Sequence, residues 1–129
     1  MTAVMLVGLG GFLGAAGRYL LSLLPFPSAF PLATLLTNLI GSILIGAVTE
    51  LFSPDGPCPS SRWMLFLRTG LCGGFTTFST FSLETFTLLE DGRTAAGAAY
   101  AFGSLAVCLA GVWLGRLLVK VGLARLRPQ

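Results

Sequence analysis

Long apolar segments with few charges are the feature that most constrains how this chain can fold. Four of them run over about residues 3–24, 31–52, 62–90 and 94–118. Each reaches the roughly 20 residues that a helix needs to cross the hydrocarbon core of a bilayer. Only 10% of the chain is charged and 54% is hydrophobic, whereas a soluble domain has about 25% charged residues. The pattern predicts an all-α membrane protein with four transmembrane helices in a single domain, residues 1–129.

Proline, turn and charged residues separate these segments. Pro25 and Pro27 prevent the first helix from continuing, and Glu50 with the turn-rich run 53–57 ends the second. A short basic tail follows the fourth segment (Lys120, Arg125, Arg127). The first segment has neither a basic region before it nor a convincing cleavage site after it, so we expect a retained span rather than a signal peptide.

The third segment is too long to be one straight span. A continuous helix over residues 62–90 would measure roughly 43 Å, which exceeds the hydrocarbon core. Within it, the stretch from Gly70 to Thr77 combines helix-disfavouring glycines with hydroxyls that can satisfy freed backbone groups. We therefore predict that the third helix is broken near mid-membrane.

The chain lacks the residues that most catalytic sites use. Histidine is absent, and the three cysteines (Cys58, Cys72 and Cys108) form neither a disulfide framework nor a zinc spacing. The formal net charge of +3 comes with no dense basic patch of the kind that binds nucleic acid. These absences argue against an enzyme, because no nucleophile–base pair or metal-ligand set is visible.

Polar side chains inside apolar spans are costly unless they find a partner or a wet cavity. On the second segment Thr34, Asn38 and Ser42 recur every four residues and share one helix face. The fourth segment repeats this spacing with weakly polar side chains (Tyr100, Ser104, Cys108). Such stripes can line a narrow polar path, although Asn38 can equally serve as an interhelical hydrogen-bonding residue that holds the bundle together.

The densest group of unusual residues runs from Gly73 to Ser82, with Glu84 just beyond. It combines glycines and hydroxyls with Phe78 and Phe81, three residues apart. These rings can be ordinary core aromatics. They can also turn their partially positive edges toward an anion, and such weak attraction suits conduction, which requires that the ion be released.

Glycines recur at helical spacing in three of the segments. The pairs are Gly10 with Gly14, Gly70 with Gly74, and Gly111 with Gly115. In lipid this spacing lets helix backbones approach closely. It predicts a compact bundle and carries no information about function.

The run from Gly70 to Ser82, together with the stretches Gly10 to Tyr19 and Ala33 to Gly41, resembles the Fluc/CrcB family of fluoride channels. The resemblance covers essentially the whole chain. It implies a fluoride-selective channel for passive fluoride export across the plasma membrane, the inner membrane of a bacterium. It also implies an antiparallel homodimer with two pores, each lined by both subunits. The fluoride pathway that it implies consists of Asn38, Phe78, Phe81, Tyr100 and Ser104.

The same resemblance implies a structural sodium ion at the dimer centre. Backbone carbonyls of the broken third helix would hold it, and the matching positions are Gly73 and Thr76. Arg18 matches an arginine near the pore mouth, where a cation can concentrate anions, and it can alternatively anchor the helix at the headgroups. Cys108 replaces a hydroxyl residue expected in some relatives, so its part in the pathway stays open.

The basic residues are unevenly distributed between the two ends of the predicted spans. Four spans place both termini on the same side as the loop around Arg62, and that side carries most of the charge (Arg62, Arg68, Arg116, Lys120, Arg125, Arg127). The opposite side carries Arg18 and Arg93. By the positive-inside rule this bias favours cytoplasmic termini, whereas an antiparallel homodimer needs insertion in both orientations.

Two other functions fit a small four-helix membrane protein. A multidrug/proton antiporter would need a carboxyl group in the first span, where this chain has none, and Glu84 is the acid well inside a predicted span. A purely structural membrane subunit would explain the glycine pairs but not the cluster of Asn, Thr and Phe. The passive channel is therefore the function that we predict.

Overall fold

The computed structural model of the chain describes residues 1–26, 30–54, 56–58 and 61–126. These residues form helices and connections without a strand, which confirms the predicted all-α class. Within them, three helices are long and apolar enough to cross a membrane: Thr2–Ser22, Leu32–Leu51 and Thr94–Arg125. Three residues used in the sequence argument, Pro27, Asp55 and Arg127, lie outside the described ranges.

The first two helices follow the predicted spans closely. Helix α1 covers Thr2–Ser22, and helix α2 covers Leu32–Leu51. Pro31 stands immediately before α2, where its fixed φ suits a helix start and its missing N–H costs nothing. The boundaries agree because proline and turn residues act locally and need no tertiary contact.

The third segment consists of several helical pieces. Ser61–Met64 (α3), the π-helical Leu65–Cys72 (η1) and Gly73–Phe75 (α4) follow one another directly. Thr76 and Thr77 then leave the helix, with φ/ψ of −78°/158° and −148°/113°, before α5 begins and runs over Phe78–Glu90. Thr76 and Thr77 are the last two residues of the stretch from Gly70 to Thr77, where the break was predicted. The glycines of that stretch are helical.

The turn after α5 requires a glycine. Gly92 has a φ of 73°, a conformation that residues with a Cβ rarely adopt. The N–H groups of Gly92 and Arg93 donate to the carbonyls of Leu89 and Leu88 and so close the end of α5.

Helix α6 is longer than predicted. It covers Thr94–Leu126, 33 residues, whereas the apolar span was expected to end near residue 118. The prediction was wrong because hydropathy measures preference for lipid, while lysine, arginine and leucine continue a helix readily in water. At 1.5 Å per residue α6 is about 50 Å long, so its basic last turns extend beyond a hydrocarbon core of about 30 Å.

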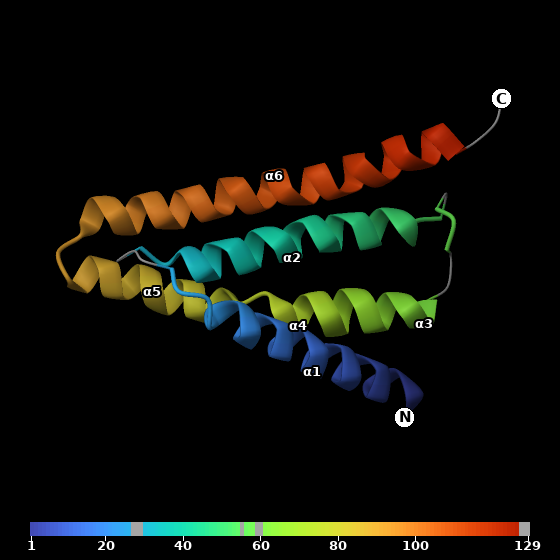
Figure 1. Cartoon of the computed structure of the whole chain (residues 1–129), viewed down its shortest axis with the longest axis horizontal. Helices are drawn as coiled ribbons and strands as arrows, with labels where there is room; N and C mark the ends of the chain where they lie inside the picture. Colours follow the sequence, from blue (N-terminus) through green and yellow to red (C-terminus); the bar gives the residue numbers. More distant parts are fainter. Residues whose placement is uncertain (27–29, 55, 59–60, 127–129) are drawn as a thin grey trace.

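The helices lie roughly lengthwise beside one another (Figure 1). Helix α6 lies along α2, while α1 crosses obliquely against η1 and α4. The start of α1, the start of α3 and the end of α6 share one end of the molecule, as four spans require. The turn between α5 and α6 lies at the opposite end.

Backbone-to-backbone contact joins α1 to the third segment. A Cβ on Gly10 would lie 2.9 Å from the Cα of Gly70, and one on Gly74 would lie 2.9 Å from the Cα of Gly11. A Cβ on Gly115 of α6 would likewise come within 2.9 Å of the Ala47 nitrogen on α2. The glycine pairs therefore permit close helix packing, as the sequence predicted.

Ion pairs link α2 to α6 near the basic end. The carboxyl group of Glu50 lies 3.0 Å from Nε of Arg116 and 3.8 Å from Nζ of Lys120. Glu50 therefore offsets part of the positive charge that the sequence places at this end of the molecule.

Candidate functional site

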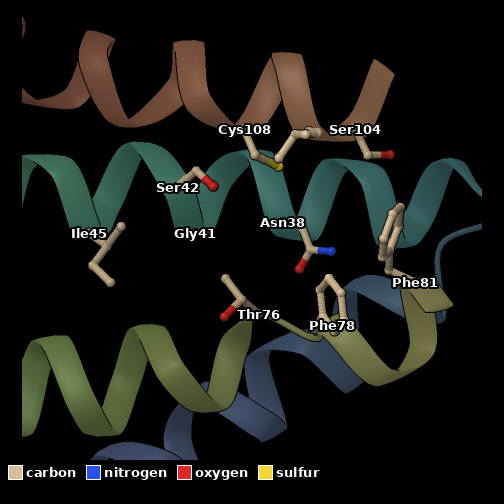
Figure 2. Close-up of a pocket in the computed structure, with 10 residues that line it drawn as sticks. Asn38, Gly41, Ser42, Ile45, Thr76, Phe78, Phe81, Ser104 and Cys108 are labelled. Atoms are coloured by element: carbon tan, nitrogen blue, oxygen red, sulfur yellow. The ribbon is translucent and has the colours of Figure 1, made fainter. Parts of the chain in front are cut away.

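A cavity of about 320 Å³ lies between α2, α5, α6 and the extended residues. We call it the phenylalanine cavity; its wall is formed by Asn38, Gly41, Ser42, Ile45, Thr76, Phe78, Phe81, Ser104, Leu105 and Cys108. Figure 2 shows the Asn38 side chain extending from α2 toward the segment that carries Thr76 and Phe78. Four of the five residues expected along the pathway (Asn38, Phe78, Phe81 and Ser104) thus share one cavity.

Three aromatic rings lie in a row beside this cavity. The centroids of Phe78 and Phe81 are 5.5 Å apart with an interplanar angle of 46°, and those of Phe81 and Tyr100 are 5.3 Å apart with an angle of 52°. Both pairs are tilted, and neither is stacked face to face. Tyr100, the fifth expected residue, contacts Phe81 but does not itself line the cavity.

Asn38 and the Thr77 backbone exchange two hydrogen bonds. The Asn38 Nδ2 donates to the Thr77 carbonyl oxygen over 3.1 Å, and the Thr77 N–H donates to Asn38 Oδ1 over 2.8 Å. These partners fix the amide orientation, because only Oδ1 can accept and only Nδ2 can donate. Since Nδ2 carries two hydrogens, one donor remains for a ligand in the phenylalanine cavity.

Glu84 joins three helices through hydroxyl groups. The Thr34 hydroxyl of α2 donates to Oε1 over 2.8 Å, and the Tyr100 hydroxyl of α6 donates to Oε2 over 2.7 Å. Thr34 was predicted on a polar stripe and Glu84 as the acid well inside a span, but their pairing was not predicted. A carboxyl group inside an apolar helix was the available signal, since such a group needs donors nearby.

A second cavity, of about 310 Å³, lies on the other side of the extended residues. Arg18 is on its wall, and we call it the arginine cavity; it is lined by Ala15, Arg18, Tyr19, Ser22, Ala33, Thr34, Thr37, Thr77 and Thr80. Hydroxyl groups and one guanidinium give it a more polar wall than the phenylalanine cavity. Arg18 therefore faces a polar recess, and its expected place at a pore mouth stays a prediction.

The extended residues separate the two cavities. Thr76 lines the phenylalanine cavity and Thr77 lines the arginine cavity. Consecutive side chains of an extended segment point to opposite sides, which explains this division. On α2, Asn38 likewise lines the phenylalanine cavity, and its neighbour Thr37 lines the arginine cavity.

Three residues named in the sequence analysis differ in their surroundings: Ser104, Cys108 and Gly73. The Ser104 side chain is buried, and its Oγ has no hydrogen-bond partner within the described part of the chain. Cys108 lies one turn further along α6 on the wall of the phenylalanine cavity, with its thiol free. Gly73 is exposed on α4, one turn before the extended residues.

Known proteins with similar sequences show the family of this chain. A family model described as CrcB-like protein, Camphor Resistance (CrcB), matches residues 5–116, which is most of the chain. The chain belongs to the CrcB family. It is thus a multi-pass membrane protein of an ion-channel family, as the sequence predicted.

Curated relatives support this membership over nearly the full length. A protein of Ruminiclostridium cellulolyticum named fluoride-specific ion channel FluC is 49% identical over 93% of this chain and 94% of its own length. The protein of the same name from Chlorobaculum tepidum is 48% identical over 94% of this chain and 97% of its own length. That from Opitutus terrae is 41% identical, with 98% of both chains covered.

Proposed function

We propose that this protein is a fluoride-selective channel that lets fluoride leave the cell passively across the plasma membrane. The names of its CrcB relatives support the choice of ion. The observation that carries the proposal is the phenylalanine cavity, where the Asn38 amide and the Phe78 and Phe81 rings share one wall. Such groups attract an anion without a formal positive charge.

Conduction requires that the pore replace the water around fluoride by several weak interactions. The spare N–H of Asn38 supplies one donor, and the edges of Phe78 and Phe81 supply further partially positive positions. The unpartnered Ser104 hydroxyl offers another donor along α6. Arg18 in the arginine cavity raises the local anion concentration before entry, because a cation in a recess attracts anions.

The working unit is an antiparallel homodimer. Phe78 is 80% exposed in the single chain although it lines the proposed pathway. A ring left in lipid cannot conduct ions, so a second subunit must cover that wall. With both subunits in place, the third span is broken near mid-membrane at Thr76 and Thr77, where extended backbone is tolerated if protein or water surrounds it.

A structural sodium ion at the dimer centre fits the carbonyls of Gly73 and Thr76. In an unbroken helix the N–H groups of Thr77 and Thr80 would donate to these two carbonyls. Instead, the Thr77 N–H donates to Asn38 and the Thr80 N–H donates to the Thr77 hydroxyl. The two oxygens are thereby freed for a cation, which is how unwound membrane helices bind sodium. Thermal unfolding in sodium and in choline salts measures whether sodium stabilises the protein.

Efflux from liposomes tests the channel function. Purified protein should dissipate a fluoride gradient without a proton gradient, as followed by fluoride- and chloride-selective electrodes. Fluoride movement that occurs only with proton exchange would instead support an antiporter, and rapid chloride efflux would contradict the selectivity.

Labelling of Cys58 tests the insertion in two orientations. This exposed cysteine lies between α2 and α3, at the basic end of the molecule. In a variant that carries Cys108→Ser, a membrane-impermeant maleimide should label Cys58 both from outside intact cells and from the cytoplasmic face in inverted membrane vesicles. Labelling from one side only, in a protein that still conducts, would rule out the antiparallel dimer.

A further inference from the structure

The short segment between α4 and α5 is held at three points by polar groups. The Thr77 N–H and carbonyl are both bound by the Asn38 amide of α2, over 2.8 and 3.1 Å. The third point is the Thr77 hydroxyl, which accepts a hydrogen bond from the Thr80 N–H over 3.2 Å and so caps α5. The backbone of Thr77 is thus held by Asn38, and its side chain caps the N-terminus of α5.

The cap includes neighbouring hydroxyl groups as well. The Thr77 Oγ1 donates to Oγ1 of Thr80 over 3.0 Å and lies 3.2 Å from Oγ of Ser79. Thr77 itself is buried, with 8% of its surface exposed. A buried hydroxyl whose donor and acceptor capacities are both used holds its surroundings in one arrangement.

Phe78 and Phe81 follow directly from this cap. Phe78 is the first residue of α5 and Phe81 lies one turn later, so the direction of the first turn determines where both rings stand. If the first turn frayed, Phe78 would lose its helical φ/ψ and move relative to the cavity wall. Among the described residues, those named above as holding Thr77 and the start of α5 by hydrogen bonds are all uncharged.

We propose that Thr77 is a positioning residue of the anion pathway. Its backbone, bound by Asn38, and its hydroxyl, capping α5, set the direction of α5 and thereby place the Phe78 and Phe81 rings against the phenylalanine cavity. This proposal rests on the proposed function. It assigns to Asn38 a role in holding the backbone in addition to that of anion donor.

Substitutions that retain or remove the hydroxyl test the proposal. Thr77→Val keeps the shape but removes the cap, whereas Thr77→Ser keeps it. Amide hydrogen exchange of residues 78–80 should become about fivefold faster in Thr77→Val, the factor by which an N-cap commonly stabilises the first turn. Fluoride efflux per folded protein should fall by about the same factor or more. Thr77→Ser should restore both quantities to within about twofold, as an equivalent cap would.

Thr87→Val serves as the matched control. It makes the same change on the exposed side of α5, where the hydroxyl donates to the Leu83 carbonyl of its own helix. Efflux and the exchange of residues 78–80 should stay unchanged. If Thr77→Val does not fold, Thr77→Ala removes the same hydroxyl without placing a methyl group in the polar site.

The two measurements distinguish the possible failures. Faster exchange with unchanged efflux in Thr77→Val would overturn the positioning role, and unchanged exchange would overturn the cap itself. A wild-type protein without fluoride efflux would refute the proposed function, and the exchange rates would still decide whether Thr77 holds the start of α5. Reduced efflux in Thr77→Ser equal to that in Thr77→Val would also contradict the proposal.

Discussion

Phe78 and Phe81 lie one turn apart with ring centroids 5.5 Å from each other, yet their surroundings differ. Phe81 contacts the Tyr100 ring and is half-buried, whereas Phe78 is 80% exposed. A ring so exposed adds little to the stability of a single chain. The difference favours a role for Phe78 in a pathway completed by a second subunit over a role in the core.

The first prediction replaces each of these rings by an aliphatic side chain. Phe78→Ile and Phe81→Ile retain much of the apolar volume but lose the polarised ring edge. We expect fluoride efflux to fall by up to about tenfold for each, because an aromatic interaction is commonly worth up to about 1.5 kcal/mol. Efflux from liposomes and the size-exclusion profile, measured on the same preparations, check this.

Phe86→Ile is the control for both variants. Phe86 lies on the same helix and is 58% exposed, but it does not line the phenylalanine cavity. Its replacement should leave efflux unchanged. Well-folded Phe78→Ile and Phe81→Ile proteins that conduct like the wild type would remove these rings from the mechanism.

The second prediction concerns Asn38→Asp. An ionised carboxyl group accepts hydrogen bonds but donates none, so it would place an oxygen against the Thr77 carbonyl and repel an anion in the cavity. We expect folding to be destabilised by about 1–3 kcal/mol, the usual cost of an unsatisfied buried group, and fluoride efflux to be nearly lost.

Thr49→Val on the same helix provides the comparison for Asn38→Asp. Its hydroxyl donates to the Ile45 carbonyl within α2, and Thr49 lines neither the phenylalanine cavity nor the arginine cavity. This variant should conduct normally. If Asn38→Asp conducted at the wild-type rate per folded protein, the Asn38 amide would neither donate to fluoride nor be needed to hold the Thr77 backbone.

The spans could be predicted from the sequence because each depends on local information. Proline positions and apolar length set α1 and α2 within two residues of the expected limits. Helix–helix packing through Gly10 and Gly70 was also predictable, since close approach requires the absence of a Cβ. The continuation of α6 beyond residue 118 was not, because hydropathy does not report helix propensity.

The polar partners in the site could not be predicted in the same way. Asn38 pairs with Thr77, 39 positions away, and Thr34 with Glu84, 50 positions away. Helical periodicity places each residue on one face of its helix. It does not show which position along a neighbouring helix that residue contacts. These pairs depend on how α2 and α5 are staggered, and that follows from the whole bundle.

The third prediction tests the Glu84 cluster through Tyr100→Phe. Tyr100 is 1% exposed and donates its hydroxyl to Glu84, so its loss leaves one carboxyl oxygen without this donor. We expect thermal unfolding to reveal a destabilisation of about 1–3 kcal/mol. Tyr19→Phe, at a ring that is 63% exposed, should leave the unfolding temperature unchanged. Equal effects of the two variants would show that the buried hydrogen bond contributes nothing.

The fourth prediction uses neighbouring glycines of α1 that differ in their surroundings. A Cβ on Gly10 would meet the Phe66 carbonyl oxygen and lie 2.9 Å from the Gly70 Cα, whereas a Cβ on Gly11 would have no described atom within 4 Å apart from its chain neighbours and the nearby backbone of α1. Because backbone atoms cannot move aside as a flexible side chain can, Gly10→Ala must push α1 away from η1, at a cost of about 1–3 kcal/mol. Gly11→Ala should be neutral or slightly stabilising, since alanine favours helix by up to about 1 kcal/mol over glycine. Thermal unfolding of the two purified variants checks the difference, and a Gly11→Ala protein less stable than Gly10→Ala would contradict the direct contact between α1 and η1.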